Sequence, residues 1–134
     1  MLIEVKNDIE EINRVRHIVQ DFCKSRMVSD KKFHDIIIIF DEIITNIIKY
    51  AYQDDQNHTF VVHMDKDNDR VIISFIDDGI AFDPLEKVDP DTQSLSIEER
   101  PIGGLGIFLV KQLADVVKYS RIGKQNRLDV TVAL

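Results

Sequence analysis

Three polar side chains recur at helical spacing within an apolar stretch of the chain: Glu42, Asn46 and Lys49. Residues four and seven positions apart lie on one face of an α-helix, so these side chains share a face. A carboxylate there could deprotonate a nucleophile, an amide oxygen could coordinate Mg²⁺, and an ammonium group could contact a phosphate. The spacing alone favours a simpler interpretation, an exposed polar stripe beside the core. The pattern by itself therefore identifies only a candidate pocket wall.

A second candidate is the end of the β-patterned run that leads to Asp77. The run closes with a carboxylate, and Gly79 then allows a turn that residues bearing a Cβ resist. Taken alone, this pattern is a strand that ends at an Asp-Gly turn, which is common.

A third candidate is the glycine cluster Gly103, Gly104 and Gly106, which runs directly into an apolar helix. Small residues free backbone N–H groups to bind an anion at a helix N-terminus. The cluster is not a Walker A loop, because the sequence contains no GxxxxGK[ST]. It is not a dinucleotide fingerprint either, because Leu109 stands where the third glycine of GxGxxG belongs. A flexible hinge without a ligand is the alternative interpretation.

Hydrophobic periodicity predicts the elements that position these residues. Helices are expected at about 8–27, 31–52 and 105–117, and strands at about 2–5, 58–64, 70–76, 116–121 and 127–134. Ser29 or Asp30 fits the N-cap of the second helix, which is apolar almost all round and so is expected to be buried. Because helices and antiparallel strands are grouped rather than strictly alternating, we predict a two-layer α+β sandwich formed by one domain, residues 1–134.

The spacer between the second and third predicted strands contains Asp65, Asp67 and Asp69, like the opening of an EF-hand loop. Arg70 stands at the position that requires glycine, and Ile76 stands at the position of the closing glutamate. The spacer is therefore predicted to be a hairpin turn.

The segment 83–102 contains all three prolines of the chain and has no periodicity. Four of the five glycines lie close to its two ends. A long segment of this kind inside a compact domain is usually functional or disordered. Glycines at both hinges indicate a lid that closes over a ligand.

Composition excludes several classes of protein. The chain has 134 residues and a net charge of −7, which argues against nucleic-acid binding through bulk electrostatics. The longest glycine-free apolar run is too short to span a membrane. One cysteine excludes an internal disulfide and a multi-cysteine zinc site. We therefore expect a soluble, cytoplasmic protein.

The order of the three motifs is more specific than any one of them. A helix with Glu42-x-x-x-Asn46, then Asp77-x-Gly79 at a strand end, then a long loop into a glycine cluster resembles the ATP-binding fold of gyrase, Hsp90, sensor histidine kinases and MutL. Within that group, the segment 42–52 is most similar to the anti-sigma-factor serine-protein kinases of bacteria. The resemblance extends over nearly the whole chain. It implies a mixed, mostly antiparallel sheet with helices on one face.

The resemblance also implies roles for residues near the phosphates. Asn46 matches the residue that coordinates Mg²⁺, and Glu42 matches the general base. Lys49 matches a basic position near the phosphates, and Gly104 and Gly106 match glycines that line the triphosphate.

On the adenine side, Asp77 matches the acceptor of the adenine amino group, and Gly79 matches a position where the backbone runs close to the base. Thr131, on the last strand, matches a hydroxyl that holds adenine through water. The resemblance further assigns nucleotide binding to the remaining motif residues: Ala81, Phe82, Gly103, Leu105 and Ile107.

The resemblance implies a function as well. Such proteins use Mg-ATP to phosphorylate a serine of a small anti-sigma-factor antagonist protein, bind a sigma factor in their other state, and tend to form homodimers. The alternative is an interaction module whose nucleotide state gates partner binding without phosphotransfer. A carboxylate at position 42 favours the kinase, because a binding module does not need a base there.

Overall fold

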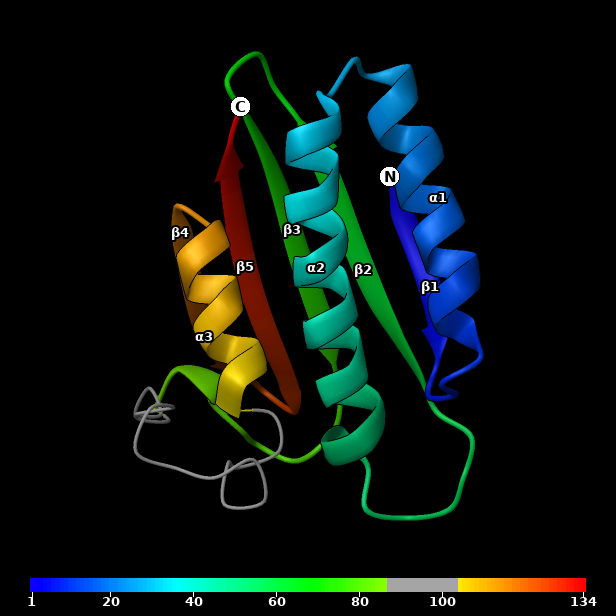
Figure 1. Ribbon diagram of the computed structural model, residues 1–134. Helices are drawn as coiled ribbons and strands as arrows, with labels where there is room; N and C mark the ends of the chain where they lie inside the picture. The colour runs from blue at the N-terminus through cyan, green and yellow to red at the C-terminus, as the bar shows by residue number, and fades with distance from the viewer. Residues whose placement is uncertain (87–103) are drawn as a thin grey trace, which may run out of the picture.

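The computed structural model describes residues 1–86 and 104–134 (Figure 1). Its helices and strands follow in chain order: β1 (Leu2–Lys6), α1 (Glu11–Ser25), α2 (Asp30–Asn46), a π-helical turn (Ile47–Ala51), β2 (Thr59–Lys66), β3 (Arg70–Asp77), a 3-10 turn (Pro84–Glu86), α3 (Gly104–Leu113), β4 (Val116–Ile122) and β5 (Gln125–Ala133).

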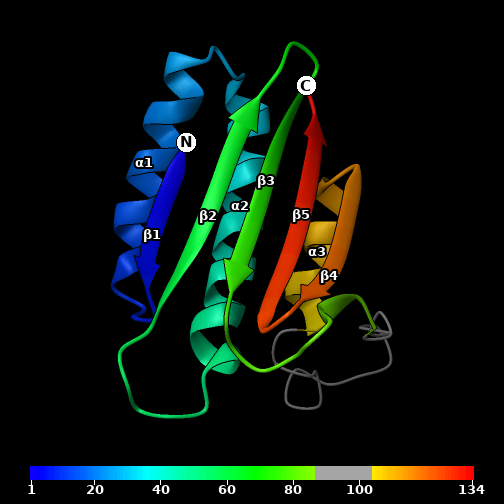
Figure 2. The same cartoon turned by 180° about the vertical axis from the view of Figure 1, so that it is seen from behind.

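The five strands form one sheet in the order β1-β2-β3-β5-β4, and each neighbouring pair is antiparallel. The three helices cover one face of this sheet, and the view from behind shows the opposite face free of helices (Figures 1 and 2). The predicted two-layer α+β architecture is confirmed. The pairings between the described strands are all antiparallel, whereas the resemblance implied a mixed sheet.

The helix α2 is the centre of the core. Its side chains Ile36, Ile39 and Ile44 are at most 1% exposed, and Phe40 meets Phe75 of β3 edge-on at 5.2 Å between ring centroids. Each such burial contributes about 1.5–3 kcal/mol. Within residues 1–86 and 104–134, no helix is long and apolar enough to cross a membrane.

The N-terminus of α2 is capped as predicted. The Ser29 side chain accepts a hydrogen bond from the backbone N–H of Lys32 at 3.3 Å. A serine cap of this kind contributes on the order of 1 kcal/mol.

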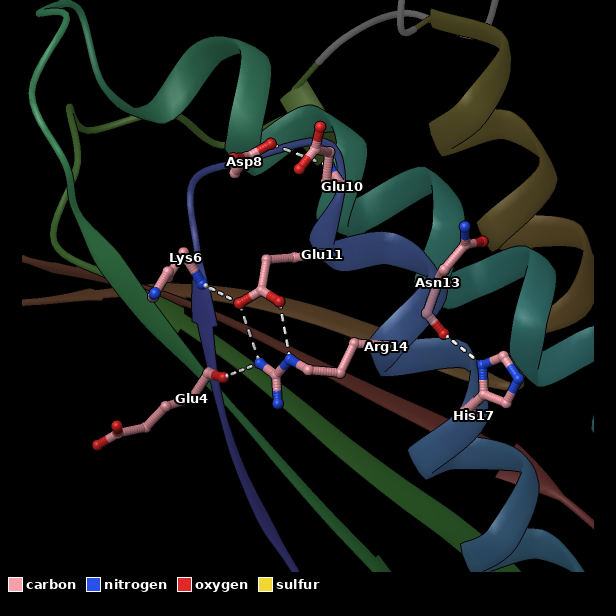
Figure 3. Close-up of polar contacts among 8 residues, drawn as sticks. All are labelled: Glu4, Lys6, Asp8, Glu10, Glu11, Asn13, Arg14 and His17. Atoms are coloured by element: carbon pink, nitrogen blue, oxygen red, sulfur yellow. Dashed lines mark hydrogen bonds and ion pairs between the residues drawn. The ribbon is translucent and has the colours of Figure 1, made fainter.

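Polar contacts fix α1 along the edge strand β1 (Figure 3). The Arg14 guanidinium donates to both carboxylate oxygens of Glu11, at 2.7 and 3.0 Å, and to the backbone oxygen of Glu4. The Lys6 backbone N–H donates to the same Glu11 carboxylate at 3.1 Å. Chiefly because of the Arg14 hydrogen bonds, the pKa of Glu11 is lowered. One ion pair thus ties the first turn of the helix to the strand before it.

The spacer 65–69 is a hairpin turn, as predicted. The Asp67 carboxylate accepts hydrogen bonds from the backbone N–H groups of Asp69 and Arg70, and from the Arg70 side chain. These local donors occupy both oxygens of Asp67, one of the carboxylates that an EF-hand would use for calcium.

The third helix is shorter than predicted, because it ends at Leu113 rather than near residue 117. Val116 and Val117 instead pair with Thr131 and Val130 of β5. Strand pairing with β5 therefore overrides the apolar helical pattern at these two β-branched positions.

Candidate functional site

An apolar cavity lies where the C-terminal end of α2 faces the end of β3, the start of α3 and the β4–β5 hairpin. Its apolar walls come from nine residues: Ile43, Ile47, Ala51, Phe75, Ile80, Phe82, Pro84, Ile107 and Leu128. Five residues add polar groups: Asn46, Tyr50, Asp77, Tyr119 and Asn126. A mostly apolar cavity with a few converging polar groups is the usual form of a small-molecule site.

Asp77 is a buried carboxylate in this cavity, with 7% of its surface exposed. Its Oδ1 accepts hydrogen bonds from the Gly79 backbone N–H at 2.9 Å and from Asn126 Nδ2 at 3.0 Å. In the part of the chain that the structure describes, Oδ2 has no hydrogen-bond partner. Burial raises the pKa of Asp77 above its ordinary value, although the two hydrogen bonds act in the opposite direction. Asp77 therefore offers the cavity one acceptor oxygen.

The segment after Asp77 is held against the π-helical turn. The Ile80 backbone N–H donates to the Ala51 carbonyl oxygen at 2.9 Å. A Cβ at Gly79 would lie 2.3 Å from that same oxygen, which is closer than any real contact. Glycine is required here for close approach of two backbone segments. The expected close approach at Gly79 is thus made to Ala51.

The three residues of the predicted polar face of the second helix do not all line the cavity. Asn46 is the last residue of α2 and lines the cavity, whereas Glu42 lies one turn earlier and does not. The Glu42 carboxylate instead faces α3, where a Cβ at Gly106 would lie 2.1 Å from Glu42 Oε2. Lys49 lies in the π-helical turn, is exposed and does not line the cavity.

The glycine cluster leads into α3, which begins at Gly104. Gly106 and Ile107 are buried, and Ile107 lines the cavity. The first N–H groups of a helix have no partner within the helix, so this end of α3 can bind an anion. Gly103 and the Leu105 side chain lie outside the described residues.

Of the two residues Ala81 and Phe82, which the resemblance assigns to the nucleotide, one lines the cavity. Phe82 lines the cavity, and Ala81 precedes it in the chain without lining it. Of the predicted lid at 83–102, the structure describes only the start, including the 3-10 turn at Pro84–Glu86. Residues 87–102 lie outside the described residues, so the lid stays a prediction.

The structure places Thr131 away from the cavity. On β5, Leu128, Val130 and Val132 are buried under the helices, so Thr131 points to the opposite face of the sheet. It pairs with Ile72, five residues from the cavity end of β3. The expectation that Thr131 helps to hold adenine is corrected by this register.

Sequence reasoning missed Asn126, which pairs directly with Asp77 across β3 and β5. Its Nδ2 donates to Asp77 Oδ1 and, at 2.7 Å, to the Ile80 carbonyl oxygen. Its Oδ1 accepts from Tyr119 Oη at 2.5 Å and from the Phe82 backbone N–H at 3.4 Å. Every hydrogen-bonding position of this buried amide is engaged. A signal was available in the alternation along β5: its helix-facing positions are apolar except for Asn126.

The described residues hold no group of three or more histidine, cysteine, aspartate or glutamate side chains arranged to bind a metal. A single protein oxygen is nevertheless enough for Mg²⁺ that arrives with a nucleotide, because that ion takes one or two protein oxygens besides phosphate oxygens and water. Asn46 offers an amide oxygen beside the cavity, and within the described ranges it makes no hydrogen bond with its side chain.

Comparison with known proteins agrees with this geometry. A family model described as a histidine kinase-like ATPase domain matches residues 5–132. The chain is 31% identical over 106 residues to the serine-protein kinase RsbW of Bacillus subtilis, covering 77% of this chain and 63% of that protein. It is 30% identical over 93 residues to RsbW of Listeria innocua, covering 67% of this chain and 59% of that protein. The chain thus spans less than two thirds of the length of these relatives.

Two solved structures show the same fold. A histidine kinase domain from Erythrobacter litoralis EL346 superposes with a TM-score of 0.56 at 14% identity, covering 92% of this chain and 59% of that chain. The SiaB-SiaC complex from Pseudomonas aeruginosa contains a chain that superposes with a TM-score of 0.55 at 10% identity, covering all of this chain and 89% of that one.

Proposed function

Because the chain belongs to the histidine kinase-like ATPase domain family, we propose that it binds ATP with Mg²⁺ and phosphorylates a serine of a small anti-sigma-factor antagonist protein. In its other state it would act as an anti-sigma factor. Relatives named serine-protein kinase at about 31% identity support this proposal. So does the sequence resemblance around Glu42 and Asn46.

The observation that carries nucleotide binding is Asp77. A carboxylate with one oxygen held by two donors and the other facing an apolar cavity accepts a hydrogen bond from a ligand N–H. The exocyclic amino group of adenine is such a donor. The flat base would lie between side chains such as Ile43 of α2 and Leu128 of β5, which both line the cavity.

The phosphates would extend from this cavity toward Asn46 and the start of α3. The N-terminal N–H groups of α3 are donors for phosphate oxygens. Mg²⁺, when bound, would neutralise phosphate charge, and Asn46 would supply its protein oxygen. Lys49 is one turn from Asn46 on the exposed side, where it adds positive charge.

Glu42 would act as the general base at the phosphate end. It lies one helical turn from Asn46 and beside Gly106 at the start of α3. In the transfer step, the serine oxygen forms a bond to the γ-phosphorus as the bond from that phosphorus to ADP breaks. The serine proton passes to the Glu42 carboxylate.

The test separates binding from chemistry. Glu42→Gln should keep Mg-ADP affinity but lose phosphotransfer to the antagonist protein by about 10²–10⁴-fold, because an amide cannot accept the serine proton. Asn46→Ala should instead weaken nucleotide binding only when Mg²⁺ is present. Equal phosphotransfer by Glu42→Gln and the wild type would favour the alternative, an interaction module that binds nucleotide without transferring phosphate.

The proposal extends to the location of the protein and to its assembly. We place the protein in the cytoplasm as a homodimer that exchanges the antagonist protein for a sigma factor. Sedimentation of the protein alone, and then with each partner in ADP and in ATP, measures these states. A monomer at all concentrations would contradict the dimer without affecting the assignment of the cavity.

A further inference from the structure

We propose that Asn126 is a positioning residue that sets base specificity, by making Asp77 Oδ2 the oxygen that faces the cavity. The inference rests on the proposed nucleotide site and extends it to a residue on β5.

The orientation of the Asn126 amide is fixed by its neighbours. Its nitrogen lies 2.7 Å from the Ile80 carbonyl oxygen and 3.0 Å from Asp77 Oδ1, both of which are acceptors. Its oxygen receives the Tyr119 hydroxyl and the Phe82 N–H. A flipped amide would set its oxygen against the Ile80 carbonyl oxygen and Asp77 Oδ1, and its nitrogen against the Phe82 N–H, so the observed orientation is the one that satisfies the site.

The fixed amide in turn selects between the two oxygens of Asp77. Both donors to Asp77, Asn126 Nδ2 and the Gly79 N–H, reach Oδ1, and Oδ2 is left for the cavity. The Tyr119 hydroxyl donates its hydrogen to Asn126 Oδ1. Toward the cavity, this hydroxyl can therefore only accept hydrogen bonds, as Asp77 Oδ2 does. Around Asp77 the wall therefore accepts hydrogen bonds. A purine with an amino group at position 6 fits this wall, whereas a 6-oxo purine places its oxygen against another acceptor.

The same geometry predicts what an amide at position 77 would do. In Asp77→Asn, the two donors still require an oxygen at the Oδ1 position, so the new nitrogen must occupy the place of Oδ2. The cavity would then present a donor where the wild type presents an acceptor. Asn126 would therefore convert a nearly isosteric substitution into an inversion of specificity.

Titration calorimetry with ADP and with inosine diphosphate tests this directly. The wild type should prefer ADP by about 5- to 150-fold, and Asp77→Asn should prefer inosine diphosphate. Asn126→Ala should reduce the preference of the wild type, and should shift the pH at which preference is lost upward, because Asp77 loses a donor to its charged form. Thr131→Ala is the matched control, since it removes a hydroxyl from the same strand on the face that points away from the cavity. Its preference should stay with ADP.

The outcomes separate the two proposals. A wild type that binds neither nucleotide overturns the proposed function. If the wild type prefers ADP but Asp77→Asn weakens both nucleotides equally, the fixed orientation is wrong. A folded Asn126→Ala protein with the wild-type preference overturns the role of Asn126. If that variant does not fold, the Asp77→Asn result decides the question in the presence of native Asn126.

Discussion

Replacing Gly106 with alanine should disable phosphotransfer without unfolding the protein. A methyl group at this position would lie 2.1 Å from Glu42 Oε2, whereas ordinary contact begins near 3.4 Å. The carboxylate oxygen must therefore retreat by about 1.3 Å, the difference between these two distances. The atom that moves is the far end of a flexible side chain, so the backbone can stay in place.

The expected magnitudes differ for stability and for catalysis. Alanine in place of glycine within a helix stabilises the folded protein by about 1 kcal/mol, whereas a strained Glu42 rotamer destabilises it by about 0.5–1.5 kcal/mol. These two effects nearly cancel, so the melting temperature should hardly change. A displacement of about 1 Å in a catalytic group can reduce its rate by about 10²-fold. Phosphotransfer by Gly106→Ala should fall by that order, while ADP affinity is retained.

The assay is single-turnover transfer from ATP to the antagonist protein, with ADP affinity measured in parallel. The control is Glu42→Gln combined with Gly106→Ala. Because both changes act on the same carboxylate, the pair should be no slower than Glu42→Gln alone. Full phosphotransfer by Gly106→Ala would refute the placement of Glu42 as base. Loss of ADP affinity would show instead that Gly106 contacts the nucleotide directly.

Four further predictions follow from the same structure. Gly79→Ala would set a Cβ 2.3 Å from the Ala51 backbone oxygen, where neither partner is a flexible side chain, so thermal unfolding should show a loss of about 1–3 kcal/mol together with weakened ADP binding. Because burial raises the pKa of Asp77, ADP affinity should decline on acidification earlier than for an exposed aspartate. Because the pKa of Asp77 is higher in the folded than in the unfolded protein, its contribution to stability is present below the unfolded pKa and is lost as pH rises through the folded pKa. Asp77→Asn removes this loss, so it should raise the melting temperature more near neutral pH than below pH about 4. Burial raises the pKa of the Cys23 thiol to about 11, so a disulfide reagent at neutral pH should label it only when denaturant is added.

The sequence predicted what local patterning controls. Alternation along 58–64 and 70–76 gave two strands close to their observed bounds, and Ser29 gave the correct N-cap. Asp77 was singled out as a strand-end carboxylate before Gly79, and its role toward adenine was implied by the family resemblance. Each of these features is decided by residues within a few positions of one another.

What the sequence did not give depends on pairing between distant segments. Asn126 acts on Asp77 from 49 positions away, and the register of β5 against β3 decides that these two residues meet. The same register turns Thr131 to the opposite face, which no resemblance of motifs could specify. Likewise, the end of α3 was set by the pairing of Val116 with β5 rather than by helix propensity.

The π-helical turn at Ile47–Ala51 has a consequence for changes in chain length. Its backbone hydrogen bonds span one residue more than those of an α-helix, so the segment holds a residue that a regular helix would not need. A one-residue deletion within 48–50 would let α-helical bonding continue and leave Glu42 and Asn46 unmoved, but Ala51 would lose its register with Ile80. The same deletion between Glu42 and Asn46 would rotate the two side chains relative to each other by about 100°. The chain therefore accommodates a lost residue after Asn46 at the cost of one backbone contact, whereas before Asn46 the loss disrupts the whole face of the helix.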